Sequence, residues 1–325
     1  MSCWWCGAGL GDGDRFCAAC GQSRRAGGPW ERAADAGLWP AEGENRMLTV
    51  LFPDLSGYMA ASRQAPGDEA VRLVDAVLGT YIDAIEQRAG FVARCMHDEV
   101  LALFGVPLAG ADDPVRAVET ALAIRDAIHA LGLDVKIAIN TGLLYFGPVG
   151  NARHAELAVV GPAADVAARL VGKGDRVAEA GQILVGESTF EQTRHCFDFA
   201  PPRVHALKGI RAPVSSHELL GARPAAGEPV GHPDAAWSRI AAEIDRLGRT
   251  DRQLLQIAGA IERPLSPDLL ARLAPAADAG RLDALAAAGW LIREGGTFTV
   301  ADPAVREVLD RSLLPARRAA LRAAV

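Results

Sequence analysis

The middle of the chain alternates between short apolar runs and longer stretches in which apolar residues recur at helical spacing. The short runs are rich in Val, Leu, Ile and Phe and predict buried strands at residues 47–52, 91–96, 100–105, 135–140 and 143–149. The helical patterns fall at residues 68–88, 112–131 and 162–172. The order of strand, helix, hairpin, helix and strand predicts an α+β sandwich of the ferredoxin-like kind.

Two segments without periodicity divide the chain. Residues 22–45 and 221–233 mix Gly, Pro, Ala and charged residues, which is typical of linkers. They separate an N-terminal segment, 1–21, and a C-terminal segment, 234–325, from the central α+β block at 46–220. We therefore expect three folded parts joined by two linkers.

The C-terminal segment is predicted to be helical, with a hairpin at residues 289–300 that turns at Gly295 and Gly296. Two helices followed by a two-stranded wing predict a winged-helix-like domain. From His232 onward, however, 13 Arg and Lys face 12 Asp and Glu, and the expected recognition helix at 279–289 offers one Arg and one Asp. Base and phosphate contacts need clustered donors, so the segment favours a protein-interaction or spacer role over specific nucleic-acid binding.

Four cysteines form two C-x2-C pairs separated by ten residues, with a glycine directly after each pair: Cys3, Cys6, Cys17 and Cys20. This spacing presents four thiolates to one tetrahedral ion and predicts a structural zinc ribbon, with redox chemistry of the thiols as the alternative. Cys95 and Cys196 stand alone and are expected to be buried or half-buried thiols.

Composition and charge exclude several classes of function. Half of the 325 residues are hydrophobic, which is enough for at least one sizeable core, and a net charge of −6 gives no overall basic field for nucleic acid or an anionic membrane. The first residues lack the pattern of a signal peptide, and no apolar run approaches the roughly 18 to 20 residues that span a bilayer. We expect a cytoplasmic protein with reduced thiols.

Two acidic residues adjoin apolar strand patterns, Asp54 in "LTVLFPDLSGYM" and Asp98 in "RCMHDEVLALFG". Taken alone, they are explained as a strand-end cap and a turn residue. Their context favours another interpretation, because "VLFPDLSGYM", "HDEVLALFGVP", "INTGLLYFGPVGN" and "VVGPAADVAARL" occur in order between residues 46 and 220. This series resembles the catalytic domain of the class III nucleotidyl cyclases, the adenylate and guanylate cyclases.

The resemblance implies a metal site. In this family the residues that match Asp54 and Asp98, with the backbone carbonyl that matches Leu55, hold two divalent cations, Mg²⁺ or Mn²⁺. The cations bridge the triphosphate and activate the ribose 3′-hydroxyl, a task that requires hard oxygen ligands. The glycine that precedes the second aspartate in the family is His97 here, which we interpret as a solvent-facing turn residue rather than a ligand.

The remaining site positions depart from the family pattern. The lysine that reads the purine is replaced by Arg94, and its Asp or Thr partner by Ala158, which has no hydrogen-bonding side chain. The asparagine that positions the ribose is replaced by Asp165, whereas the arginine that stabilises the transition state is kept as Arg169. The resemblance thus implies retained metal ligands beside degenerate base and ribose recognition.

Two functions follow from the resemblance. The first is a weak soluble cyclase that converts a nucleoside triphosphate, with ATP expected, to cyclic nucleotide and pyrophosphate at the interface of a homodimer or heterodimer. The alternative is an inactive pseudocyclase that binds nucleotide or metal and serves as a regulatory or heterodimer partner. The C-terminal segment resembles the helical part of cyclase-fused signalling ATPases, but no G-x-x-x-x-G-K-[ST] motif of an ATPase occurs in the sequence.

Overall fold

The computed structural model describes residues 9, 11, 43–55, 67–96, 99–151, 154–172, 177–224, 233–261, 263–274 and 279–324. Within these ranges the chain folds as two compact units. One unit comprises Met47–Leu144 and Leu157–Ala236, and the other contains Arg46, Tyr145–Glu156 and the C-terminal part from Trp237 onward. None of the helices in the described ranges is long and apolar enough to cross a membrane.

Nine strands of the described residues form one mixed sheet with the order β2-β3-β1-β4-β6-β9-β7, in which β5 also pairs with β4 and β8 with β9. The strands are β1 Glu44–Leu55, β2 Phe91–Met96, β3 Glu99–Phe104, β4 Val135–Asn151, β5 His154–Val160, β6 Ile183–Gly186, β7 Phe197–Phe199, β8 Arg203–His205 and β9 Val214–Ala222. Strand β2 forms one edge of this sheet.

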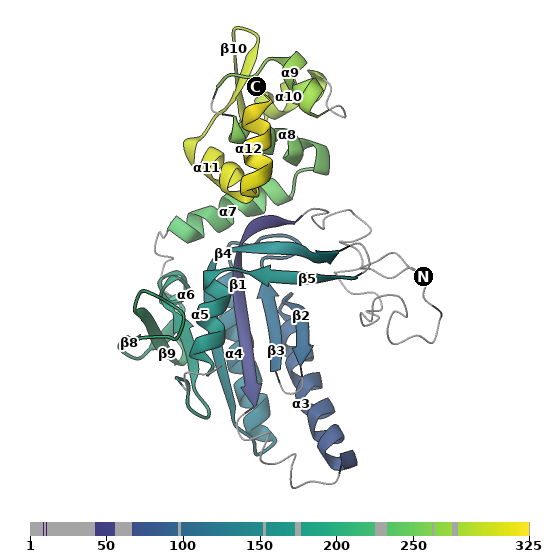
Figure 1. The fold of residues 1–325 in the computed structure, drawn as a ribbon. Helices are drawn as coiled ribbons and strands as arrows, with labels where there is room; N and C mark the ends of the chain where they lie inside the picture. The colour runs from purple at the N-terminus through teal and green to yellow at the C-terminus, as the bar shows by residue number, and fades with distance from the viewer. Residues whose placement is uncertain are drawn as a thin grey trace. The chain divides into compact units, whose positions relative to one another are not determined.

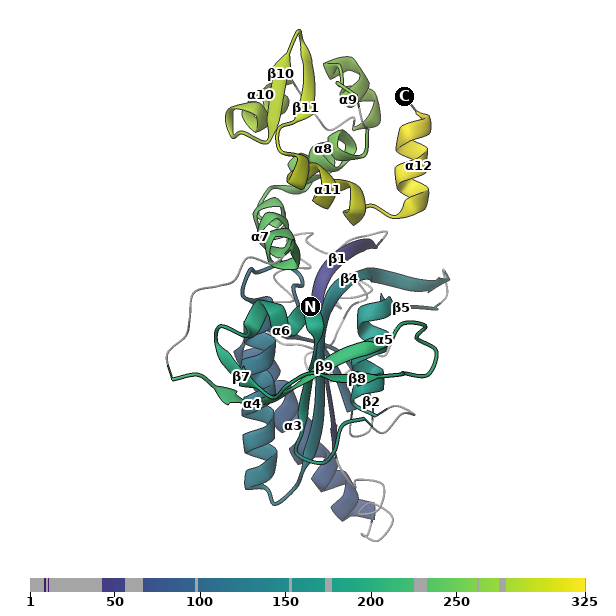
Figure 2. The same cartoon turned by 90° about the vertical axis from the view of Figure 1, so that its left-hand side faces the viewer.

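Helices cover both faces of the sheet (Figure 1, Figure 2). They are α3 Gly67–Gln87, α4 Asp113–Ala130, α5 Pro162–Leu170 and α6 Glu187–Thr193. Tyr81 of α3 and Ile124 of α4 are fully buried against Leu51, Ala102 and Ile137 of the sheet. Helix α5 packs on the other face, where it approaches β4. Burial of these apolar faces, at about 25 cal/mol per Å², supplies the main driving force for the fold.

The order β1-α3-β2-β3-α4-β4 confirms the α+β pattern predicted from the sequence. One difference concerns residues 135–140 and 143–149, which the sequence predicts as two strands and which form the single strand β4. The predicted break falls at Thr141 and Gly142. Thr141 is buried, and its hydroxyl lies 2.9 Å from the hydroxyl of Thr49 on β1. The contact between the two hydroxyls satisfies a polar side chain at a buried position, so β4 continues through the predicted break.

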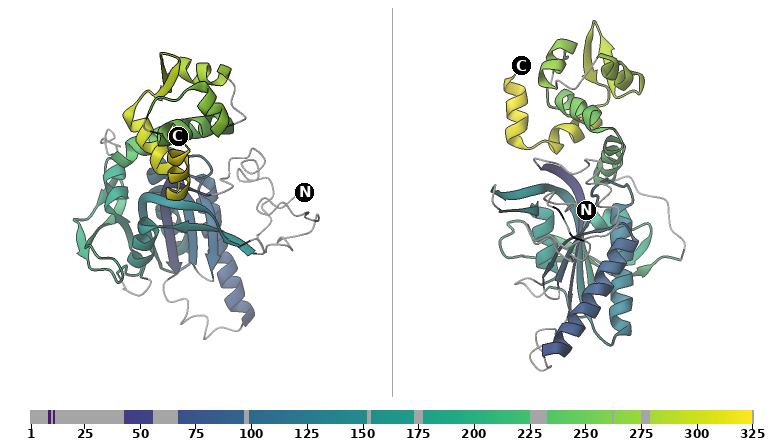
Figure 3. Two further views of the ribbon diagram at one scale, coloured as in Figure 1. Left: turned by 45° about the horizontal axis from the view of Figure 1, so that its top comes forward. Right: turned by 90° about the vertical axis from the view of Figure 1, so that its right-hand side faces the viewer.

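The C-terminal unit is mainly helical (Figure 3). Its elements are α7 Pro233–Asp245, α8 Arg249–Ala260, α9 Pro267–Leu273, α10 Ala279–Ala287, β10 Leu291–Glu294, β11 Thr297–Val300, α11 Pro303–Ser312 and α12 Pro315–Ala323. Strands β10 and β11 form the predicted hairpin, and φ is +55° at Gly295 and +84° at Gly296. Two consecutive positive φ values define the tight turn that favours glycine. The assignment to the winged-helix class stays a prediction.

A buried ion cluster ties the first residues of β1 to this unit. Asp245 of α7 accepts from Arg46, and its other carboxylate oxygen lies 2.9 Å from Nη1 of Arg252 on α8. Arg46 and Asp245 are 6% and 7% exposed. A carboxylate between two arginines compensates much of the desolvation cost that a buried charge would otherwise carry.

Candidate functional site

Asp54 lies on the sheet face opposite to the one that α3 and α4 cover. Leu51 and its cross-strand partner Ala102 belong to the core beneath those helices. Successive side chains of a strand point to opposite faces, so Asp54, three residues after Leu51, points away from α3 and α4. Its cross-strand partner is Glu99 of β3, whose side chain therefore points the same way.

Arg94 joins this face because of an irregularity in β2. Val92 pairs with Ala102, but Arg94 pairs with Leu101, so the register shifts between them. Without this bulge Arg94 would point toward the helices, as Val92 does; with it, Arg94 shares the face of Glu99. Cys95 was expected to be buried or half-buried, and this prediction is wrong: Cys95 is exposed on β2, an edge strand of the sheet.

A pocket of about 300 Å³ opens on this face. It is lined by Phe52 of β1, Ala93 and Arg94 of β2, Glu99, Val100 and Leu101 of β3, and Leu157, Ala158 and Val159 of β5. The structure therefore brings Arg94 and Ala158, which are 64 residues apart in the sequence, to the walls of a single pocket. Phe52 and Leu157 give it an apolar wall, while Arg94 and Glu99 supply a donor and an acceptor.

Glu99 was missed from the sequence. Its signal was the alternation in β3, because Val100 and Ala102 are buried with the core and Glu99 must then face the other side. The neighbouring Asp98 is the residue that matches a metal ligand, and the predicted strand begins one residue after Glu99, at Val100.

Lys136 of β4 was also missed. Its Nζ lies 3.4 Å from Oδ2 of Asp54, and the two side chains are 23% and 19% exposed. The carboxylates of Asp54 and Glu99 occupy directly opposed positions, and like charges in such positions repel. Lys136 offsets part of that repulsion. The alternation in "VKIAIN" could have found it, since Ile137 is a core residue and Lys136 points to the other face.

The other predicted side chains come from α5. Asp165 is exposed in the first turn of this helix and Arg169 is half-buried in its last turn. The helix begins after Gly161, where φ is +147°, a value that side-chain-bearing residues rarely adopt. It also contacts β4 closely, because Nδ2 of Asn140 donates to the carbonyl of Ala163 at 3.1 Å. These contacts set the position of α5 relative to β4.

Several predicted site residues lie outside the described ranges: Asp98, His97, Cys3, Cys6, Cys17 and Cys20. Leu55, whose carbonyl was a predicted ligand, is the buried last residue of β1. Among the described residues no three His, Cys, Asp or Glu side chains gather to hold a metal. Asp54 offers the carboxylate oxygens that a hard divalent cation prefers, and its predicted partner Asp98 is outside the described ranges.

Two family models match the chain. The model described as the adenylate and guanylate cyclase catalytic domain matches residues 41–220, more than half of the sequence. A zinc-ribbon domain matches residues 2–23, which confirms the ribbon predicted from the cysteine spacing.

Curated relatives match the central part of the chain. An uncharacterized protein of Mycobacterium tuberculosis is 30% identical over 158 residues, which cover 47% of this chain and 28% of that protein. An adenylate cyclase of Anabaena cylindrica is 27% identical over 143 residues, which cover 39% of this chain and 27% of that protein. The match thus spans less than a third of the length of these relatives.

Solved structures share the fold. The guanylyl cyclase Cya2 superimposes with a TM-score of 0.51 at 27% identity and covers 58% of this chain and 100% of its own. The adenylyl cyclase CyaB from P. aeruginosa gives a TM-score of 0.53 at 23% identity with the same coverage.

Proposed function

Because the chain belongs to the adenylate and guanylate cyclase catalytic domain family, we propose that it converts a purine nucleoside triphosphate to a cyclic nucleotide and pyrophosphate. One observation carries this proposal. Asp54, Glu99 and Arg94 share one sheet face, and the last two line a pocket together with Ala158. In the reaction the ribose 3′-oxygen bonds to the α-phosphorus, the bond to the β-phosphate oxygen breaks, and the hydroxyl proton is released to solvent.

Asp54 and Asp98 hold the cations of this proposal, together with the backbone carbonyl of Leu55. Bound Mg²⁺ or Mn²⁺ ions would supply the positive charge that stabilises the attacking and leaving oxygens. Lys136, 3.4 Å from Asp54, keeps the carboxylate oriented and offsets its charge when no cation is present. A cation that binds Asp54 then competes with Lys136, which weakens metal affinity relative to an unpaired aspartate.

Arg94 and Glu99 are the proposed readers of the base, and they change the expectation that ATP is the substrate. Guanine offers O6 as an acceptor to Arg94 and presents two adjacent donor groups, N1–H and N2–H₂, that match the two oxygens of Glu99. Adenine offers a carboxylate one donor group on the same edge. We therefore propose that the pocket prefers GTP to ATP, with Ala158 contributing shape but no hydrogen bond.

In this proposal, residues of α5 contact the ribose and stabilise the transition state. Arg169 stabilises the negative charge that develops on the α-phosphate. Compared with the asparagine of the family, Asp165 lacks the amide donor and places a carboxylate near the ribose and phosphates, which lowers turnover. Each chain presents Asp54 and the base pocket on the same sheet face. In the proposed dimer these faces meet, and the metal aspartates of one protomer act together with the base pocket and α5 of its partner, so each active site needs both copies.

The second candidate is a catalytically inactive partner module. Ala158 and Asp165 favour it, since neither can make the hydrogen bond expected from the residue that the family has there. Such a chain would still supply Asp54 and Asp98 to a heterodimer whose partner has intact base and ribose residues. The two candidates differ in one measurable property, turnover by this chain alone.

The deciding experiment measures cyclic nucleotide formation by the purified full chain from GTP and ATP with Mn²⁺ or Mg²⁺. We expect slow, metal-dependent turnover that is faster with GTP. Asp54→Asn should lower it at least about a hundredfold, because a metal ligand is lost. Asp134→Asn serves as the matched control, since Asp134 is exposed just before β4 and should leave the rate unchanged.

Base selection is tested in the same assay with Glu99→Gln. The ratio of kcat/KM for GTP over ATP should fall about ten- to a hundredfold, the range for loss of a bidentate base contact. An unchanged ratio would show that Glu99 does not read the base. If the wild-type chain binds Mn²⁺-GTP but forms no product, the inactive partner module becomes the function of this chain.

A further inference from the structure

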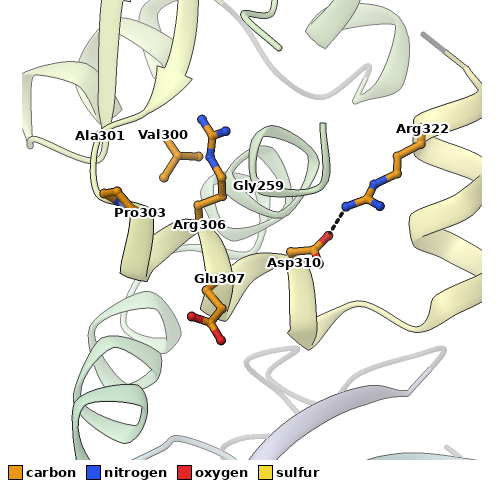
Figure 4. Close-up of a pocket in the computed structure, with 8 residues that line it drawn as sticks. All are labelled: Gly259, Val300, Ala301, Pro303, Arg306, Glu307, Asp310 and Arg322. Carbon is orange, nitrogen blue, oxygen red and sulfur yellow. Dashed lines mark hydrogen bonds and ion pairs between the residues drawn. The ribbon is translucent and has the colours of Figure 1, made fainter. Parts of the chain in front are cut away.

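The C-terminal unit contains a pocket that the proposed cyclase chemistry does not use. Its volume is about 470 Å³, within the range of small-molecule sites. Figure 4 shows the side chains that line it, which come from the end of α8, the end of β11, and helices α11 and α12: Gly259, Val300, Ala301, Pro303, Arg306, Glu307, Asp310 and Arg322. We propose that this pocket binds a small organic anion with one carboxylate group and a compact apolar body.

Three of the four charged side chains in the pocket already have partners. Asp310 lies 3.0 Å from Nη2 of Arg322 and 2.9 Å from Nη1 of Arg318. Glu307 lies 3.1 Å from Nη1 of Arg311, one turn further along α11. These pairs neutralise the two carboxylates of the lining without drawing on Arg306.

Arg306 is the exception. No hydrogen bond or ion pair of its guanidinium is found among the described residues, and its side chain is half-buried. In Figure 4 it extends from α11 toward Val300, on the side away from Glu307. A guanidinium presents a planar set of donors that fits a carboxylate in a bidentate manner, and a half-buried one without a partner is suited to bind an anion.

Arg322 is held in place at the same pocket. Its Nε donates to the carbonyl of Ala260 at the end of α8 over 2.9 Å, and a terminal nitrogen contacts Asp310. The two anchors fix the guanidinium with respect to α8 and α11. Arg322 therefore shapes the wall of the pocket and adds positive potential, while Arg306 makes the direct contact to the anion.

The rest of the lining selects a compact apolar body. Val300, Ala301 and Pro303 form an apolar wall beside Arg306. Helices α8 and α11 pack tightly, because a methyl group at Gly259 would lie 2.5 Å from Cβ of Leu309. Glycine at position 259 therefore lets α8 and α11 approach each other at the pocket. An apolar group placed there loses contact with water and gains contact with these residues.

Charge argues against a polyphosphate in this pocket. Two arginines and two carboxylates line it, and only Arg306 lacks a charged partner among the described residues. A triphosphate would bring several negative charges close to Glu307 and Asp310, whereas one carboxylate balances Arg306 alone. The proposed ligand class is therefore distinct from the nucleotide of the β1–β3 face.

The experiment uses the full chain and two matched probes, phenylbutyrate and its neutral amide, phenylbutyramide, in calorimetric titrations. We expect saturable binding of the carboxylate and at least about tenfold weaker binding of the amide, because hydrogen bonds to charged partners are the stronger ones. Arg306→Gln should weaken phenylbutyrate at least about tenfold, and Arg306→Lys should restore part of the affinity. Arg293→Gln on β10, outside the pocket, is the control and should change nothing.

Three results would overturn the proposal: no saturable binding up to about 10 mM, equal affinity for the two probes, or full affinity in Arg306→Gln. Stronger binding of ATP than of phenylbutyrate that depends on Arg306 would contradict the monocarboxylate class. Circular dichroism of each variant checks that it is folded. None of these measurements depends on cyclase activity, so the outcome is independent of the proposed function.

Discussion

Asp165 is the clearest departure of the proposed site from the residues that the cyclase family has there, where an asparagine is expected. It lies exposed in the first turn of α5, four residues before Arg169, and both point from the same side of the helix. A carboxylate near the N-terminus of a helix is favourable for the helix itself. The change from asparagine therefore has no cost in local stability, and in the proposed function its effect falls on the nucleotide.

We expect Asp165→Asn to raise cyclase turnover by about a hundred- to a thousandfold, the usual effect of one oriented donor. Adding Arg94→Lys and Ala158→Thr should shift the preference toward ATP, because the pair then offers adenine both a donor and an acceptor. Arg169→Ala in that background should abolish the gain. Product formation is measured for the starting chain and the three variants at equal protein concentration.

The matched control is Asp68→Asn, the same change in the first turn of α3, where Asp68 is 74% exposed. It should leave turnover unchanged. If the triple variant binds Mn²⁺-ATP but forms no more product than the starting chain, the barrier lies elsewhere in the site.

At the scale of elements, the site depends on how closely α5 approaches β4. A methyl group at Gly142 of β4 would lie 2.7 Å from Cβ of Ala163 on α5. Glycine at this position lets the helix sit directly against the strand. The position of Asp165 and Arg169 relative to the sheet face thus depends on a glycine of β4 that packs against α5.

Gly142→Ala should destabilise the fold by about 1–3 kcal/mol, the typical cost of overpacking, and should lower turnover because α5 is displaced. Gly79→Ala is the matched control. Nothing lies within 4 Å of a methyl group at Gly79 of α3, so alanine should raise stability by about 0.5–1 kcal/mol. Denaturant unfolding and product formation measure both variants, and equal stability of the two would refute the packing argument.

At the scale of the whole molecule, the cyclase domain is combined with a zinc ribbon, matched at residues 2–23, and with the C-terminal unit. The boundaries predicted at 22–45 and 221–233 stay predictions. The proposed pocket of the C-terminal unit gives the chain a second ligand besides nucleotide.

We expect one zinc ion per chain, bound by Cys3, Cys6, Cys17 and Cys20. Changing Cys17 and Cys20 to Ser should remove it, because two thiolates cannot hold the ion alone. Cys196→Ser is the control: burial, followed by the charge of Glu119, raises the pKa of the Cys196 thiol and disfavours the thiolate that binds metal. Metal analysis of protein purified without chelator decides the matter, and a zinc content unaffected by the double change would contradict the ligand set.

The sequence by itself determined the features that depend on neighbours along the chain. Periodicity predicted α3 within one residue at each end and β2 without error. Gly295 and Gly296 marked the hairpin, because only a few residues adopt positive φ at low cost. Cysteine spacing predicted the ribbon, and an ordered series of motifs predicted the family; both depend on residues close together in the sequence. The role of Asp54 stays a prediction.

Only the tertiary structure decided which side chains meet. The bulge after Val92 turns Arg94 to the face of Glu99, and periodicity alone would have placed it toward the helices. Lys136 reaches Asp54 from a strand some eighty residues away. Within the described ranges Arg306 has no charged partner, because Glu307 and Asp310 pair with other arginines. These outcomes depend on strand register and on competition among charges distant in sequence, and neither is encoded in a local pattern of residues.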